Sequence, residues 1–563
     1  MAQQYGYQQE MNYQQPQQPQ QPQQPQYGNQ NYGNQQQQQY GESQGYYQNQ
    51  SQPPPGPPPN ASYGQQQQQQ QQQQYTQQAP NYNADYNQGF KPNTIEGGGK
   101  QSFEQTFKLD KPKYNDLWAG ILLIIVFLGF VAISALSLRT FVGTNSGGIY
   151  QNKNAFTVNS NTIILFAFVL VVAFVLSWLY LIAARAFTKQ FIWITGILNV
   201  LLGVATGVYY LYRKQYSAGI VFLLFAAFSA FCFFTWIKRI PFSVLMLQTS
   251  VDVARNYGHV FMVSFLGGFV ALVFGAWYSV TLAALYAANA PESEACRSGG
   301  CSQAKLIGLI AYITFAAYWI TEWIKNTVYT TIAGVYGSWF FCAGNANNFP
   351  NNATRGAFRR SITYSFGSIS LGSLIVAIIN SIRQLVNVGQ NSEAQQGNAA
   401  AACALCILGC IISILQQVAE WINRYAFSHI ALYGKPYVAA AKDTWKMIKD
   451  RGIDALINDC LVGPVLSMGS VFVGFVCALL AFLYLEFTKP AYNESGGYFP
   501  VIMAFSFLIG LQMCQIIMTP LGCGVDTIFV ASAWDSQTLI STHPDLYQKM
   551  IQLYPRVQES IHA

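Results

Sequence analysis

Long apolar segments alternate with short polar segments between residues 117 and 520. Each apolar segment has about 20 residues, the length that a helix needs to cross the hydrocarbon core of a bilayer. The pattern therefore predicts an all-α polytopic membrane protein with about ten transmembrane helices. Because this number is even, both termini are expected on the same side of the membrane. The predicted spans cover residues 117–138, 162–184, 191–212, 217–237, 260–288, 304–334, 361–382, 399–422, 461–487 and 498–520.

The first 95 residues have a different composition, dominated by Gln, Tyr, Pro and Asn. They include a proline cluster at residues 53–59 and a glutamine run at residues 65–74. Such a segment buries too little apolar surface to offset the entropy lost when it is ordered. We therefore expect residues 1–95 to form a disordered cytoplasmic tail. It serves either as a solvated tail or as a binding segment for protein partners.

Charged residues make up 9% of the chain and hydrophobic residues 51%, which excludes an ordinary soluble protein. The net charge is +7, but Lys and Arg lie between apolar segments rather than on one face, so the charge does not indicate nucleic-acid binding. These basic residues concentrate in alternate loops, which the positive-inside rule places in the cytoplasm together with both termini. The tail is thus followed by a cytoplasmic juxtamembrane segment at residues 96–116, the ten-helix domain at residues 117–520 and a cytoplasmic C-terminal tail at residues 521–563.

Two cysteines, Cys296 and Cys301, lie in the polar external loop after the fifth predicted span. An oxidising exterior favours a disulfide between them. Asn493 begins an Asn-Glu-Ser sequon in the last external loop, so it is a predicted glycosylation site.

Sequence motifs for bond-breaking chemistry are missing from this chain. Its four histidines form no HExxH helix, and it contains neither a P-loop nor a GxSxG elbow. Cys403, Cys406 and Cys410 recur at helical spacing in an apolar segment without a histidine partner, which favours packing over metal binding. The sequence thus predicts a protein that is not an enzyme and that uses no metal or cofactor.

The sixth predicted span contains ionisable groups, which are costly inside a membrane and are therefore candidates for function. Its stretch AYWITEWIK places Tyr318 four residues before Glu322 and Trp319 four residues before Trp323, so each pair shares a helix face. A carboxylate beside aromatic rings is able to bind an organic cation through charge and cation–π attraction. Alternatively, Lys325 only neutralises Glu322 near a membrane interface.

The seventh predicted span, residues 361–382, is rich in Ser and Gly. Its residues Ser361, Ser365, Ser368 and Gly372 follow one another at helical spacing and are expected on one helix face. Small residues allow helix backbones to approach closely within lipid. Hydroxyl groups are also able to line a path for a polar solute. Both interpretations stay open, and the second makes Ser365 and Ser368 candidate substrate-binding residues.

Three stretches form a specific combination. They are FRRSITYSFGSISLGSLIVAIINSIR at residues 358–383, INRYAFSHIALYGKPYVAAAKDTW at residues 422–445 and AGVYGSWFF at residues 333–341. Together they resemble the choline transporter-like family, over roughly residues 110–540. The Gln-rich tail and the short external loop after the first span resemble the fungal, pH-nine-sensitive (Pns-type) branch of that family.

The resemblance implies a ten-span plasma-membrane protein with cytoplasmic termini, surrounded by the lipid bilayer. It also implies solute transport, with choline or a related small organic cation as the substrate class. Glu322 departs from the family, which tends to have an uncharged residue at this position. The alternative function is that of a plasma-membrane organising protein, which acts through partners of its Gln-rich tail and does not transport choline.

Overall fold

The computed structural model describes residues 107, 113–144, 160–212, 214, 216–257, 259–289, 302–342, 350, 352–450, 460–488 and 499–555. All of them belong to one unit, Asn83–Ala563, and the other unit, Met1–Tyr82, lies outside them. Within the described ranges, ten helical stretches are long and apolar enough to cross a membrane. This confirms the predicted all-α polytopic fold.

The spanning helices are α3 (Leu117–Thr144), α4 (Ser160–Ala186), α5 (Thr188–Tyr212), α6 (Tyr216–Trp236), α8 (His259–Asn289), α9 (Gln303–Phe341), α11 (Phe366–Gln395), α12 (Ala399–Tyr433), α15 (Val462–Thr488) and α16 (Phe499–Trp534). The shorter described helices are η1 (Ile237–Arg239), α7 (Ile240–Asn256), α10 (Ala353–Ile362), α13 (Tyr437–Asp450), α17 (Ser536–Thr542) and α18 (Pro544–Leu553). Lipid offers no hydrogen-bond partners to the backbone N–H and C=O groups, and a helix pairs these groups internally. This is why the apolar segments cross the bilayer as helices.

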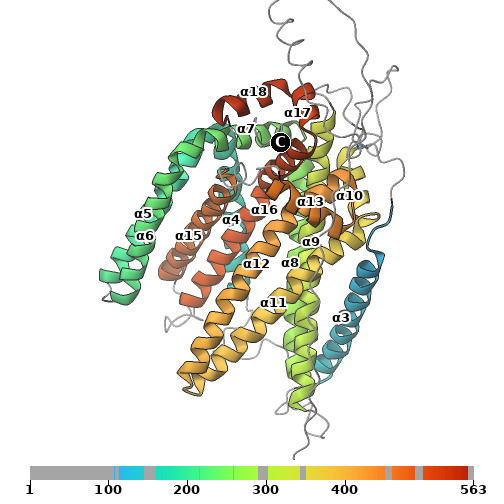
Figure 1. Ribbon diagram of the computed structural model, residues 1–563. Coiled ribbons are helices and arrows are strands. Elements are labelled where there is room, and N and C mark those ends of the chain that lie inside the picture. The colour runs from blue at the N-terminus through green and yellow to red at the C-terminus, as the bar shows by residue number, and fades with distance from the viewer. Residues whose placement is uncertain are drawn as a thin grey trace, which may run out of the picture. The chain divides into compact units, whose positions relative to one another are not determined.

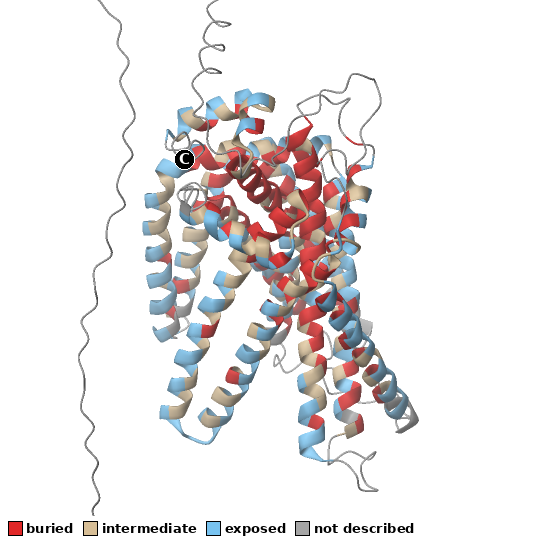
Figure 2. Cartoon of the chain, turned by 45° about the vertical axis from the view of Figure 1, so that its right-hand side comes forward, coloured by how far each residue is buried: buried red, intermediate tan, exposed pale blue. Residues whose placement is uncertain are grey.

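The shorter helices α7, α10, α13, α17 and α18 gather at one end of the bundle, which we call the capped end (Figure 1). The first spanning helix, α3, also begins there. Buried residues concentrate toward the capped end (Figure 2). In α11 nearly all of them lie between Gly367 and Ala377, and in α12 most lie between Asn423 and Leu432. The opposite end, where α11 passes into α12, is called the open end.

Two apolar clusters hold the bundle together. The larger one draws on α4, α7, α9, α12, α15 and α16, and the smaller one, around Trp319, joins α3, α8, α9 and α11. α9 belongs to both clusters and is therefore held from several sides, so its polar side chains have fixed positions. The α5–α6 hairpin stands at the edge of the bundle, and its two helices pack mainly on each other (Figure 1).

The serine-rich segment is divided between two helices rather than forming one span from residue 361. Residues 363–365 form a turn between α10 and α11. In this turn the backbone N–H of Ser365 donates to the carbonyl oxygen of Arg360 at 3.0 Å. The predicted single stripe of small residues is therefore wrong for Ser361, which lies on α10, before the break in the helix.

The last span also differs from the prediction, because α16 continues through Pro520 to Trp534. Proline lacks the N–H that would bond to the carbonyl oxygen of residue 516, and a proline usually breaks a helix for this reason. Here the hydroxyl of Ser264 on α8 donates to the Ile516 carbonyl instead. A neighbouring helix thus replaces the missing bond, and the span keeps its course.

Candidate functional site

α9 carries the acidic group that the sequence singled out. Glu322 forms an ion pair with Lys325, with 3.4 Å between Oε2 and Nζ. The Glu322 side chain is 14% exposed and that of Lys325 is 58% exposed, so the carboxylate is embedded while its partner extends outward. Tyr318 lies one turn before Glu322 and is half-buried. The structure therefore brings Tyr318 and Glu322 to one face, and it also contains the Lys325 pairing of the alternative interpretation.

The two tryptophans of the predicted site face a neighbouring helix. Trp319 is fully buried, and its Nε1 donates to the Ser370 carbonyl of α11 at 2.9 Å. Trp323 packs edge-on against Phe366 of α11, with 5.5 Å between ring centroids. Both rings hold α9 against α11, and neither forms a cage around Glu322 in this conformation.

α12 adds a row of polar groups next to Glu322. Gln416 donates from Nε2 to Glu420 at 2.9 Å and accepts a hydrogen bond from Arg383 of α11 at 2.8 Å. Glu420 lies close enough to Glu322 for their charges to interact. Carboxylates from α9 and α12 thus face a common region, although the two helices are far apart in the sequence.

One turn further along α12, Arg424 approaches Asp526 of α16. Its Nη1 lies 3.9 Å from Oδ2 of Asp526, and the same oxygen accepts a hydrogen bond from the Tyr329 hydroxyl of α9 at 2.9 Å. Tyr425 also bonds to this carboxylate. The charge of Arg424 interacts with Glu420 as well as with Asp526. Arg424 therefore stands between two carboxylates, one on its own helix and one on α16.

We call these groups the polar column. Its members are Tyr318, Glu322, Lys325 and Tyr329 of α9, Arg383 of α11, Gln416, Glu420 and Arg424 of α12, and Asp526 of α16. The column contains three carboxylates and three basic side chains, so it is formally neutral. An organic cation that entered it would have to replace one of the protein's own cations. Such a column can hold a positively charged solute.

Sequence reasoning missed Arg424 and Asp526 as members of the site. The sequence prediction places Asp526 in the C-terminal tail, because the tenth predicted span ends at Pro520. The signal that could have found it is the apolar run that continues after Asp526 to Trp534. An acidic residue inside such a run is a candidate for function by default.

Ser368, a predicted substrate-binding residue, lies in a junction at the start of α11. Its hydroxyl donates to Oδ2 of Asp116 at 2.7 Å, and the backbone N–H of Tyr437 donates to the same oxygen at 2.8 Å. Burial raises the pKa of Tyr437 to about 12, so its hydroxyl keeps the proton and donates to Asn423 at 2.5 Å. Asn423 in turn donates to the Gly372 carbonyl at 3.1 Å. The junction ties α3, α11, α12 and α13 together, and a substrate role of Ser368 stays a prediction.

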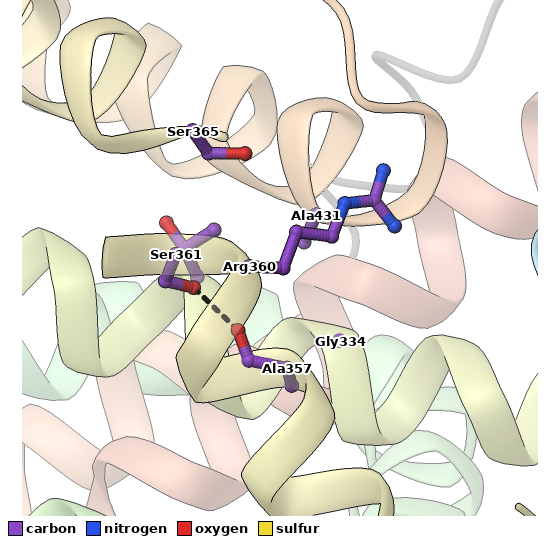
Figure 3. A pocket seen from close by; sticks show the side chains of 7 residues that line it. Gly334, Ala357, Arg360, Ser361, Ser365 and Ala431 are labelled. Carbon is purple, nitrogen blue, oxygen red and sulfur yellow. Dashed lines mark hydrogen bonds between the residues drawn. The ribbon is translucent and has the colours of Figure 1, made fainter. Parts of the chain in front are cut away.

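Ser365, the other predicted serine, borders a small pocket at the capped end (Figure 3). The pocket is too narrow to hold a water molecule, and α9, α10 and α12 contribute the small residues Gly334, Ala357 and Ala431. Arg360 is buried beside it, with its guanidinium carbon 5.4 Å from the centre of the Phe107 ring. The three helices approach closely here, which closes the capped end between them.

Some of the predicted groups cannot be placed. Cys296, Cys301 and Asn493 lie outside the described residues, so the disulfide and the glycan stay predictions. Cys403, Cys406 and Cys410 are exposed on α12, and the packing role expected for them stays a prediction.

Comparisons with known proteins extend the resemblance to most of the chain. A family model described as plasma-membrane choline transporter matches residues 220–537. Protein PNS1 of Gibberella zeae is 57% identical over 479 residues, which cover 84% of this chain and 88% of the relative. The pns1 protein of Aspergillus fumigatus is 56% identical over 466 residues, with 82% and 87% covered. PNS1 of Yarrowia lipolytica is 43% identical over 494 residues, with 86% of both chains covered.

Proposed function

This chain belongs to the plasma-membrane choline transporter family, in the branch of the fungal PNS1 proteins, and on that premise we propose that it carries a small organic cation, choline or a related amine, across the plasma membrane. The observation that supports this function most directly is the polar column. Ionisable groups inside a span mark a path or a binding site far more often than they stabilise a fold. Here they come from four helices and face one another within an apolar bundle.

The cation binds at Glu322 and Glu420, in the part of the column that is nearer the open end of the bundle. Two carboxylates of α9 and α12 attract its positive charge, and the Tyr318 ring adds cation–π attraction. Lys325 lies on the exposed side of Glu322, so it is the protein cation most easily replaced. In this step one ammonium group is exchanged for another, and the charge of the column does not change.

Passage toward the capped end requires the Arg424–Asp526 pair to separate. Arg424 follows Glu420 by one turn of α12, on the side of the capped end, and its pairing with Asp526 closes the column toward α16. Because Glu420 lies one turn away on α12, it is able to accept Arg424 when the cation leaves it. Transport then alternates between a state with Arg424 on Asp526 and a state with Arg424 on Glu420.

The capped end faces the cytoplasm in this proposal. Lys113, just before α3, and the basic residues of α10 and α13 belong to this end. Basic residues are retained on the cytoplasmic side during insertion. The sequon at Asn493 and the pair Cys296 and Cys301 then lie outside the cell. Digestion with a glycosidase tests the sidedness, because it should increase the mobility of the wild-type protein and leave Asn493→Gln unchanged.

Uptake of labelled choline and ethanolamine in cells that lack their own uptake system tests the function. Cells with the protein should accumulate at least one of the two amines faster than cells without it, and Glu322→Gln should remove most of the gain. Equal uptake in all three strains would reject both amines as substrates. Deleting residues 1–95 separates this function from that of a membrane organiser, because a transporter keeps its flux without the tail.

A further inference from the structure

An apolar groove lies between the two helices of the α5–α6 hairpin, beside η1. Its cavity volume is about 270 Å³, and it is open to the surroundings on one side. Its lining residues are all apolar and include Leu201 of α5, Ala230 and Phe234 of α6, and Ile237 of η1. The groove is therefore a surface for hydrocarbon, and it is separate from the polar column.

The floor of the groove is fixed by close packing of the two helices. The Phe233 ring lies directly against Gly196, where any side chain would collide with it. Trp193 packs edge-on against the same ring, with 5.5 Å between centroids. Next to the Phe233 ring, the small side chain of Ala230 leaves the space that forms the groove. The groove is thus formed by the fold before any ligand is bound.

The groove opens toward lipid. Leu201 is 58% exposed and Phe234 73% exposed, although both line it. The hairpin packs against the rest of the bundle only sparsely, through α4, α7 and α15. A lipid acyl chain can therefore enter from the side, without passing through the rest of the bundle.

Basic side chains surround one end of the groove. Lys238 and Arg239 follow Ile237 directly, and both are exposed. Lys189, also exposed, lies in the first turn of α5, and because α5 and α6 run antiparallel it belongs to the same end of the hairpin (Figure 1). At this end the headgroups of anionic lipids would meet three positive charges.

We propose that the groove is a binding site for an anionic phospholipid, with an acyl chain along Leu201, Ala230 and Phe234 and the headgroup phosphate at Lys238 and Arg239. The apolar groove and the basic rim meet at Ile237. Only an amphipathic ligand contacts both the groove and the rim. A soluble phosphate would use the rim alone, and a neutral lipid would use the groove alone. The inference does not depend on which solute the protein transports.

Native mass spectrometry of the purified full-length protein, incubated with equal amounts of dioleoyl phosphatidylserine and dioleoyl phosphatidylcholine, tests the site. We expect preferential retention of phosphatidylserine. The variant Lys238→Gln/Arg239→Gln should weaken this retention by roughly tenfold or more, because each basic residue near the surface contributes a severalfold gain. Ala230→Phe should weaken it as well by filling the groove.

Two matched variants serve as controls. Lys214→Gln removes a charge at the opposite end of the hairpin, and Ala227→Phe adds the same ring at an exposed alanine one turn before Ala230. Both should retain phosphatidylserine like the wild type, and the melting temperature of every variant shows that it is folded. Equal retention of the two lipids would overturn the proposal. It would also be overturned if Ala230→Phe had no effect while the charge variant did, since that result indicates an anion on the rim alone.

Discussion

Arg424 of α12 and Asp526 of α16 form an ion pair at the end of the polar column that is nearer the capped end, with 3.9 Å between Nη1 and Oδ2. Tyr329 of α9 donates to the same carboxylate oxygen. A single oxygen atom thus connects three spanning helices that are distant in the sequence. Any movement that opens the capped end between these helices has to separate the three groups.

Removing one partner of this pair should destabilise the protein more than removing both. Arg424→Gln leaves the Asp526 carboxylate buried without a counter-ion, and breaking a buried pair in this way costs about 3–5 kcal/mol. We expect a value near the lower limit, because the Arg424 side chain is 46% exposed. The double variant Arg424→Gln/Asp526→Asn should regain about 1 kcal/mol or more. Thermal unfolding of the wild type, Arg424→Gln, Asp526→Asn and the double variant measures this coupling.

A charge-matched control comes from Arg383, which donates to the uncharged side chain of Gln416. Arg383→Gln should lower the melting temperature less than Arg424→Gln does, since the side chain that Arg383 contacts carries no charge. A coupling energy below about 0.5 kcal/mol between Arg424 and Asp526 would contradict the ion pair as a connection between α12 and α16.

Gly372 should tolerate no side chain, because α11 packs there against two aromatic rings. A Cβ at this position would lie 2.5 Å from Tyr437 and 2.7 Å from Phe427. Gly372→Ala should therefore cost about 1–3 kcal/mol through overpacking. In Gly275→Ala on α8 the new Cβ meets nothing within 4 Å, and alanine favours the helix by up to about 1 kcal/mol. Melting temperatures that fall equally in both variants would contradict close packing at Gly372.

The fold could be predicted largely from the sequence, because each span has to be long and apolar by itself. The all-α class, the ten spans and the family were confirmed. The predicted boundaries of the spans were wrong where contacts with other helices determine them. Nothing near residue 520 indicates that Ser264, far away in the sequence, replaces the hydrogen bond that Pro520 lacks. The turn at residues 363–365 is likewise stabilised by a contact with another segment, since the Asn115 N–H donates to the Tyr364 carbonyl.

The site could be predicted only within one helix. Tyr318 and Glu322 share a face of α9 because of helical spacing, which the sequence displays. The approach of Glu420 and Arg424 depends on how α12 packs against α9, and that arrangement cannot be derived from periodicity. Helical spacing correctly places Trp319 one turn before Trp323 on α9. It does not show that the Trp319 ring packs against α11 and donates to the Ser370 carbonyl. The sequence thus shows which side chains of one helix are candidates for a site, but it does not show which residues of other helices they contact.

The attachment of α17 and α18 to the end of α9 should weaken in acid. His543 stacks on Trp339 with 4.4 Å between ring centroids, and its Nε2 bonds to the Phe340 carbonyl at 3.1 Å. Burial lowers the pKa of His543 below its ordinary value of 6.5. The unfolded state therefore binds more protons, so this contribution to stability is complete above pH 6.5 and is lost as the pH falls through the lower pKa of the folded state.

Hydrogen–deuterium exchange of α17 and α18 measures this effect, after correction for the intrinsic pH dependence of exchange. Protection should decrease severalfold between pH 7.5 and pH 5.5, values about one unit above and below the ordinary histidine pKa. His543→Phe keeps an aromatic ring but cannot titrate, so its protection should not depend on pH. His259→Phe, at the start of α8, serves as the control and should behave like the wild type. Unchanged protection of the wild type across this range would contradict the role of His543.

The proposed cation site predicts effects of opposite sign for two residues that share one ion pair. Glu322→Gln removes the embedded carboxylate and should raise the KM for choline about tenfold, the equivalent of one charge-assisted contact. Lys325→Gln removes the internal counter-ion that choline has to replace, so it should lower the KM severalfold. Initial uptake rates over a range of choline concentrations measure both values. Lys305→Gln, an exposed charge on the same helix, should leave the KM unchanged. If the pair were only structural, both variants would break the same bond and transport would decline in both, so losses in the same direction would reject Glu322 as the cation site.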